Sequence, residues 1–198
     1  MIGIANVLVK KSFNNFSPSA SFFVFALISF VCWGSAGIIF GFTPGNILYG
    51  TLVGFSTAIL GQGIYFHALS KGELSINVPI LASYSVYTVI FSLLFNHEHV
   101  GLLTGLCVLI AILGTIVVAF PDKISKSELK KLSPILWAVG AAVAIGASDT
   151  LSKRYINDAS VGNFFVYAAI AQVVVSFGYM KLQHQSFDQF AGMFKSLR

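Results

Sequence analysis

The sequence predicts an all-α protein, a polytopic bundle of transmembrane helices, and three observations lead to this fold class. The chain is 56% hydrophobic and only 10% charged, with a mean hydropathy of +0.83, whereas a soluble domain carries ~25% charged residues. Six apolar stretches each approach the ~20 residues that a helix needs to cross a ~30 Å hydrocarbon core. None of them shows the ~10-residue alternation of a membrane β-barrel strand.

The apolar stretches are separated by short connections and one long one. The turns at residues 43–45, 71–73 and 97–99 are short enough to make consecutive helices antiparallel neighbours. The charged segment Pro121–Ser133 is longer, and its capping box, Ser125 to Glu128, predicts a short amphipathic helix. The six stretches are Phe22–Phe42, Asn46–Ser70, Leu74–Asn96, Val100–Phe120, Pro134–Tyr155 and Ala159–Met180.

The net charge and the two cysteines exclude several other classes. A net charge of +5 is usual for a membrane protein whose Lys and Arg residues lie in cytoplasmic loops. The chain has no basic stripe with interleaved aromatic residues, so no nucleic-acid partner is predicted. Cys32 and Cys107 are too few for a disulfide framework or a zinc site, and both are expected to be small buried side chains within apolar stretches.

An internal repeat emerges when the chain is shifted by 143 residues against itself. Positions 3–26 and 146–169 then share seven identities in 24 positions, including Lys10 with Lys153. Since Gly146–Arg154 is the end of a spanning helix, Gly3–Lys11 is expected to be the end of one too. A repeat of odd helix number is inverted across the membrane, as in many secondary transporters.

This repeat divides the chain into three parts. Residues 1–121 are expected to form a first repeat, with a stub of its first helix followed by four spanning helices. Residues 122–132 form a charged linker, and residues 133–198 begin a second repeat with two spanning helices and a tail. On this division, the chain is expected to be cut at both ends.

Several short elements, spread over nearly the whole chain, combine into a family pattern. They are Trp33-Gly34-Ser35, Ala68-Leu69-Ser70-Lys71-Gly72, Pro79, Glu98, Gly105, Gly114 and Gly146–Lys153. In order and spacing, these elements resemble the EamA branch of the drug/metabolite transporter superfamily. The resemblance implies an inverted five-plus-five helix repeat around a central cavity. Relative to that pattern, the chain lacks the start of helix one and all of helices eight to ten.

Asp149 and Lys153 are the leading candidates for a functional site. They lie four residues apart on one helix and face the same side, and a charge within a membrane helix is costly unless it faces a cavity or a partner. The pair could bind substrate or couple protons, or it could be structural, with Lys153 reaching the headgroups. Asn6 and Lys10 occupy the equivalent positions of the first repeat and are assigned to the same substrate cavity.

Further candidates are polar or amphipathic residues inside the apolar stretches. Trp33, Gln62 and Tyr84 are assigned to the substrate cavity, although most Tyr residues in membrane helices serve packing or the interface. Pro79 removes a backbone donor and is expected to kink its helix. His67 could couple protons, but it is expected to be a hydrogen-bonded residue near a helix end.

These observations predict a membrane transporter-family protein that moves a small organic solute by alternating access. The alternative is a truncated, non-transporting fragment of such a transporter. No enzymatic activity, cofactor or metal is expected, because Asp149 has no catalytic partner and Glu98 with its flanking histidines lies on too short a turn to converge on one ion. The expected partners are the lipid bilayer, an unidentified solute and a second copy of the chain, and the expected location is the plasma or inner membrane.

Two arguments disagree on the orientation of the chain. Loops after odd-numbered helices hold ten Lys and Arg residues and loops after even-numbered helices hold two, Lys153 and Arg154. The positive-inside rule therefore places Lys123–Lys131 in the cytoplasm, whereas the family resemblance places this segment outside. We follow the charge bias and expect a Ser127→Cys variant to resist an impermeant thiol reagent until cells are permeabilised. Labelling in intact cells would contradict the cytoplasmic assignment.

Overall fold

The computed structural model of the chain describes residues 9–13, 16–96, 101–119 and 132–185, and within these residues all regular structure is helical. Five helical segments are long and apolar enough to cross a membrane: Pro18–Ile39, Ile47–Lys71, Ile76–Phe95, Ser133–Asp158 and Val161–Leu182. The sixth apolar stretch forms α7 (Leu102–Ala119), of which Leu102–Gly114 counts as a shorter apolar helix. The chain is therefore an all-α, multi-pass membrane protein.

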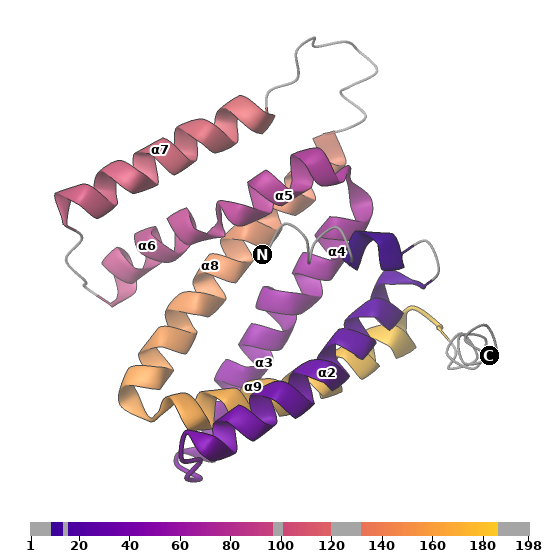
Figure 1. Ribbon diagram of the computed structural model, residues 1–198, viewed down its shortest axis with the longest axis vertical. Helices are drawn as coiled ribbons and strands as arrows, with labels where there is room; N and C mark the ends of the chain where they lie inside the picture. Colours follow the sequence, from indigo (N-terminus) through magenta and orange to yellow (C-terminus); the bar gives the residue numbers. More distant parts are fainter. Residues whose placement is uncertain (1–8, 14–15, 97–100, 120–131, 186–198) are drawn as a thin grey trace.

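Helices α2 (Pro18–Ile39) and α9 (Val161–Leu182) form an antiparallel pair. Serine side chains N-cap both helices and accept hydrogen bonds from Ala20 N and Asn163 N. The end of α2 lies against the start of α9, because the position of a Cβ on Gly37 is only 2.9 Å from the Gly162 carbonyl oxygen. Figure 1 shows the two helices lying together along one edge of the bundle.

The third span runs through the middle of the bundle as three consecutive helical segments. These are α3 (Ile47–Ser56), the π-helix η1 (Thr57–Gly63) and α4 (Ile64–Lys71). In Figure 1 this rod lies between α8 (Leu132–Asp158) on one side and α2 with α9 on the other. The sequence does not predict η1, because no residue pattern distinguishes a π-turn from the α-helix around it.

The fourth span is interrupted near its middle. It consists of α5 (Leu74–Ala82) and α6 (Tyr84–Phe95), with the break at Ser83. Pro79 lies inside α5, so the interruption falls four residues after the proline. The Ser83 hydroxyl donates to the Ile80 carbonyl oxygen at 2.6 Å, a local bond that competes with regular helix geometry.

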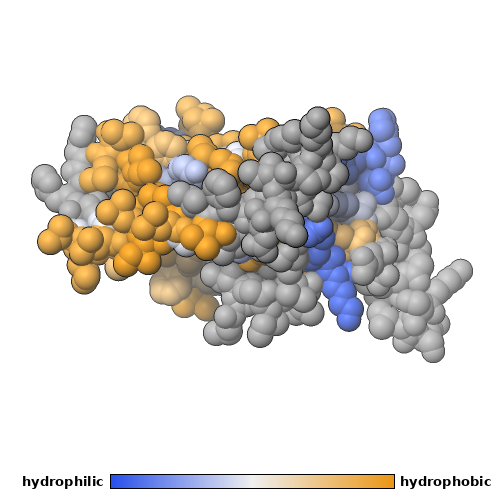
Figure 2. Space-filling model, turned by 90° about the horizontal axis from the view of Figure 1, so that it is seen from above, coloured by the Kyte–Doolittle hydropathy of each residue, from blue (hydrophilic) through white to orange (hydrophobic). Residues whose placement is uncertain are grey.

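Large hydrophobic side chains cover the outside of the bundle. Those of α7 are strongly exposed, for example Leu102 and Ile110, and Figure 2 shows a broad hydrophobic surface on the side of the molecule where α7 lies. Lipid rather than water suits such a surface. The expectation that Cys32 and Cys107 are buried is wrong, because both are exposed. A lipid-facing position accepts a small apolar side chain as readily as a core position does.

Several segments named in the sequence analysis lie outside the described residues. They are Asn6, the turn with Glu98, and the amphipathic helix expected in the linker. Residues 9–12 are helical, and Val9 packs with Phe13 against a buried cluster that includes Leu69, Ile80 and Ala138. The described part of the first repeat's expected stub therefore lies against the bundle.

Candidate functional site

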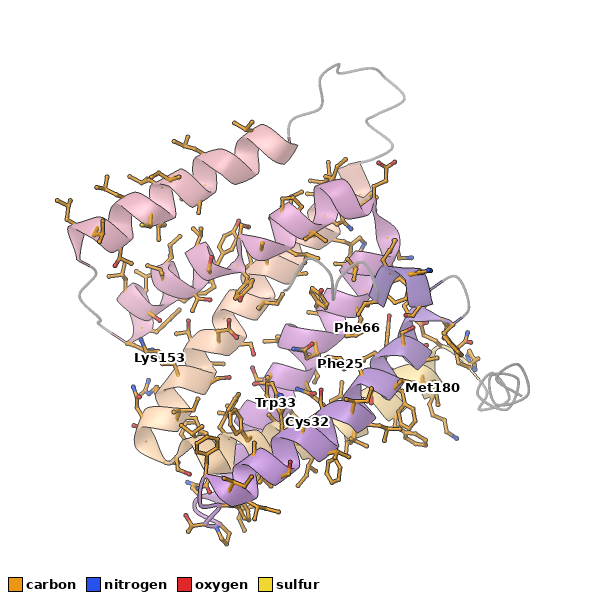
Figure 3. All side chains as sticks on the ribbon, viewed as in Figure 1. Phe25, Cys32, Trp33, Phe66, Lys153 and Met180 are labelled. Carbon is orange, nitrogen blue, oxygen red and sulfur yellow. The ribbon has the colours of Figure 1, made fainter. Side chains whose placement is uncertain are left out.

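A cavity of about 330 Å³ lies between the third span and α8. We call it the α8 cavity. Figure 3 labels two of its lining residues, Trp33 on α2 and Lys153 on α8. Its lining residues come from α2, η1, α8 and α9: Trp33, Thr57, Gly61, Gln62, Ile145, Asp149, Ser152, Lys153, Ile156 and Phe164. Four of the residues proposed from sequence, Trp33, Gln62, Asp149 and Lys153, are therefore brought together.

The α8 wall of the cavity is one face of a helix. The α8 residues that line the cavity lie four, seven, eight and eleven positions after Ile145, which is the spacing of side chains along one face of a helix. They are Asp149, Ser152, Lys153 and Ile156. Asp149 and Lys153 are the charged members of this stripe, and Ser152 lies between them. Both signs of charge therefore line one cavity, on the membrane-spanning part of α8.

Helix α6 holds Asp149 in place. The Asp149 carboxylate is hydrogen-bonded to the Thr88 side chain, and the Thr88 hydroxyl is also 3.0 Å from the Tyr84 carbonyl oxygen. The two helices can meet this closely because Gly146 has no side chain. A Cβ on Gly146 would lie 2.6 Å from the Cβ atom of Tyr87 and 2.8 Å from the Thr88 nitrogen.

The opposite wall of the cavity is built by η1. The last amide of the π-turn, on Ile64, bonds to the Ile59 carbonyl five residues earlier, so the residues of this segment project differently from those of an α-helix. Thr57, Gly61 and Gln62 all line the cavity. Thr57 also links this wall to α8, because its hydroxyl lies 3.1 Å from the Ser152 hydroxyl.

An aromatic group closes one side of the cavity. Trp33 on α2 lies with its ring centroid 6.2 Å from Phe164 and 5.4 Å from Phe165 on α9. The cavity thus combines an aromatic wall with hydroxyl, amide and charged groups. Ligand sites commonly have this composition, in which apolar walls bury the ligand and a few polar groups orient it.

Other residues proposed from sequence lie elsewhere. Lys10 caps the end of α4, and its Nζ donates to the carbonyl oxygens of Leu69 at 2.8 Å and Gly72 at 2.9 Å. Tyr84 begins α6 and reaches the site only through its carbonyl contact with Thr88. Pro79 lies within α5, away from the lining residues.

His67 lies near the end of α4, at the side of α9. Its Nδ1 atom is 2.9 Å from the Tyr179 hydroxyl, and its ring contacts Trp137. Within the part of the chain that the structure describes, no group of three His, Cys, Asp or Glu residues could hold a metal ion.

Several lining residues were not among the candidates predicted from the sequence. Ser152 and Ile156 could have been found, since they continue the helical stripe that contains Asp149. No sequence pattern predicts the other lining residues, because their positions depend on η1 and on the packing of α9. These residues are Thr57, Gly61 and Phe164. Thr88 was missed for a similar reason, as it reaches Asp149 only through the close contact at Gly146.

The fold and the cavity define a polytopic helical membrane protein with a polar, charged chamber among its spans. A model of the EamA-like transporter family matches residues 1–120, which is more than half of the 198-residue chain. The chain therefore belongs to the EamA-like transporter family. No curated protein and no solved structure matches the chain.

Proposed function

We propose that this protein moves a small organic solute across the plasma or inner membrane through the α8 cavity, by alternating access. The observation that carries the proposal is the joint presence of Asp149 and Lys153 on one cavity wall inside the membrane-spanning part of α8. Intramembrane charges are costly, and they commonly mark substrate or ion pathways. Membership of a transporter family supports the same function.

The chemistry of the lining restricts the solute. A cavity volume of about 330 Å³ suits a small metabolite. Asp149 can accept hydrogen bonds from a cationic or hydroxyl group, and Lys153 can bind an anionic one. Trp33 and Phe164 offer apolar contact. The proposed solute is therefore small and polar, with an apolar part that packs against the aromatic wall.

The inverted repeat remains part of this proposal, and α2 and α9 support it. Each helix has 22 residues, and both of their ends are separated by the 143-residue shift that aligned the sequence. Ser17 and Ser160, equivalent under this shift, form their N-caps. Helices related by a pseudo-two-fold axis in the membrane plane run antiparallel, as these two do. The match of the family model to residues 1–120 coincides with the proposed first repeat.

An Asp149→Asn variant should lose at least tenfold of its solute uptake while keeping its membrane expression. The exchange is nearly isosteric but removes the charge that faces the cavity. The measurement is uptake into proteoliposomes from a panel of radiolabelled amino acids, nucleosides and polyamines. Asp158→Asn is the matched control, since Asp158 is exposed at the end of the same helix and should transport normally.

Two results with the Asp149→Asn variant would contradict the proposal. One is uptake by Asp149→Asn equal to that of the unchanged chain. The other is reduced expression of Asp149→Asn that a second change, Lys153→Gln, restores, because such rescue indicates a structural charge pair. Failure of the unchanged chain to move any solute of the panel above empty liposomes would also count against it.

A further inference from the structure

The hydroxyl groups of Thr57 and Ser152 form a pair between two walls of the α8 cavity. Their oxygen atoms are 3.1 Å apart. Both residues line the cavity, and they are 7% and 6% exposed. Thr57 is the first residue of η1, and Ser152 lies on α8. The pair therefore joins the third span to α8 beside the cavity.

The two hydroxyl groups have more contacts than protons. The Thr57 hydroxyl can donate to the Val53 carbonyl oxygen at 3.0 Å, and the Ser152 hydroxyl can donate to the Ser148 carbonyl oxygen at 2.8 Å. When both protons are used in this way, none is left for the contact between the two hydroxyl oxygens. Their lone pairs then remain available to a third group, and a cation can satisfy both oxygens at once.

Asp149 adds a negative charge next to this pair. It lies three residues before Ser152 on α8 and lines the same cavity. Side chains at this spacing are neighbours on a helix, with Cβ atoms ~5–6 Å apart. The hydrogen bond with the Thr88 side chain uses one of about four lone-pair positions of the carboxylate. The remaining positions can bind a cation that also contacts Ser152.

The size and charge of this donor set suit a sodium ion. Sodium is nearly as large as calcium, whose oxygen ligands lie at about 2.3–2.6 Å. Two oxygens ~2.4 Å from one ion and 3.1 Å apart form an angle of about 80° at the ion, close to the right angle of an octahedral site. One carboxylate balances one positive charge, whereas a divalent ion would leave excess charge beside Lys153, which also lines the cavity.

The ammonium group of Lys153 weakens cation binding without preventing it. Lys153 is exposed and lies one turn nearer the end of α8 than Asp149, so water and salt screen its charge. Asp149 is half-buried, and the hydroxyl pair is buried. We therefore expect sodium to bind in the millimolar range, which suits an ion that is released in every transport cycle.

We propose that the α8 cavity binds a sodium ion through the Asp149 carboxylate and the hydroxyl oxygens of Ser152 and Thr57. The amide oxygen of Gln62, which lines the same cavity, and water complete the coordination. Because the ligands come from α8 and η1, the bound ion holds these two walls together. Irregular helices supply ion ligands in this way in many secondary transporters. A sodium gradient then drives uptake of the solute, a role that rests on the proposed function, whereas ion binding does not.

The first test measures the binding of radioactive sodium to the purified full chain in detergent, by equilibrium dialysis at constant ionic strength. We expect saturable binding of one ion per chain. Potassium should compete at least tenfold more weakly, because its larger radius requires longer ligand distances than the hydroxyl pair allows. Absence of saturable sodium binding, or equal competition by potassium, would overturn the proposal.

Variants of the hydroxyl pair test the ligands. Thr57→Val keeps the shape of the side chain but removes its oxygen, so it should weaken sodium binding at least tenfold. Thr57→Ser keeps the oxygen and should bind sodium like the unchanged chain. The control is Ser176→Ala, which removes a buried hydroxyl that donates within α9, away from the cavity lining. Unchanged sodium binding by Thr57→Val, or an equal loss in Ser176→Ala, would overturn the proposal.

Uptake into proteoliposomes separates this inference from the proposed function. We expect an inward sodium gradient to accelerate solute uptake at least tenfold over an equal potassium gradient. Equal uptake in potassium, without sodium binding, would overturn the ion site and leave the proposed function intact. Uptake driven by a pH gradient alone would mean that a proton occupies Asp149, and it would also overturn the ion site. Sodium binding without uptake of any solute would contradict the proposed function and support the ion site.

Discussion

Replacing Gly146 by alanine should destabilise the folded bundle by about 1–3 kcal/mol. The added Cβ would lie 2.6 Å from the Tyr87 Cβ, 2.8 Å from the Thr88 nitrogen and 3.0 Å from the Tyr87 carbonyl carbon. Two of these atoms belong to the backbone of α6, so no side-chain rotation relieves the overlap. Helices α6 and α8 must move apart, and the resulting loss of packing should appear as a lower melting temperature in detergent.

Gly140→Ala is the matched control on the same helix. A Cβ at Gly140 meets nothing within 4 Å, and alanine favours a helix over glycine by up to about 1 kcal/mol. This variant should therefore be as stable as the unchanged chain or slightly more stable. Equal melting temperatures for the two alanine variants would mean that α6 and α8 are not in close contact at Gly146.

The Gly146→Ala variant should also affect the α8 cavity. The contact at Gly146 brings Thr88 within hydrogen-bonding distance of Asp149. If the helices separate, Asp149 loses this partner and its carboxylate changes position in the cavity wall. Uptake by Gly146→Ala should consequently fall even in molecules that remain folded, whereas Gly140→Ala should transport normally.

Much of the helical architecture could be predicted from the sequence, because lipid imposes a simple rule. Inside the bilayer, every backbone N–H and C=O group must find its hydrogen-bond partner within the helix. The apolar stretches and the breaks between them therefore predict the spanning helices directly. The α2 region shows this well: the expected stretch was Phe22–Phe42, and the helix is Pro18–Ile39. Its early start follows from Ser17, an N-cap, and Pro18, which is suited to the first helical turn.

The candidate site could be predicted only in part. Polar and amphipathic groups are conspicuous in apolar helices, so the sequence predicts four residues that do line one cavity: Asp149, Lys153, Trp33 and Gln62. Lys10 was selected by its symmetry with Lys153, yet it caps α4 instead. The 143-residue shift shows which positions of the two repeats are equivalent, but it does not show what each residue contacts. Those contacts depend on helices that are far apart in the chain. The break at Ser83 and the π-turn η1 likewise depend on packing.

The π-turn should be essential for transport but dispensable for folding. A π-helical segment behaves as an α-helix with an inserted residue, and here it places Thr57, Gly61 and Gln62 on the cavity wall. Deleting Ile59, whose side chain is 47% exposed, should convert η1 to α-helix while α4 keeps its present face toward α8. We expect uptake to fall at least tenfold and the melting temperature to change by only a few degrees, because the deleted side chain is exposed and α3 and α4 keep their packing on either side of η1.

A deletion in the regular helix just before η1 provides the comparison. Leu52 in α3 is also lipid-exposed, but removing it rotates the residues between this position and η1 by about 100°. Phe55 would then take the place of Gly54, where a Cβ lies only 2.6 Å from the Tyr167 carbonyl oxygen, and the bundle should fail to fold. If the Ile59 deletion misfolds in the same way, η1 is part of the packing and not a removable insertion. If that variant folds and still transports normally, the π-turn does not position the cavity wall.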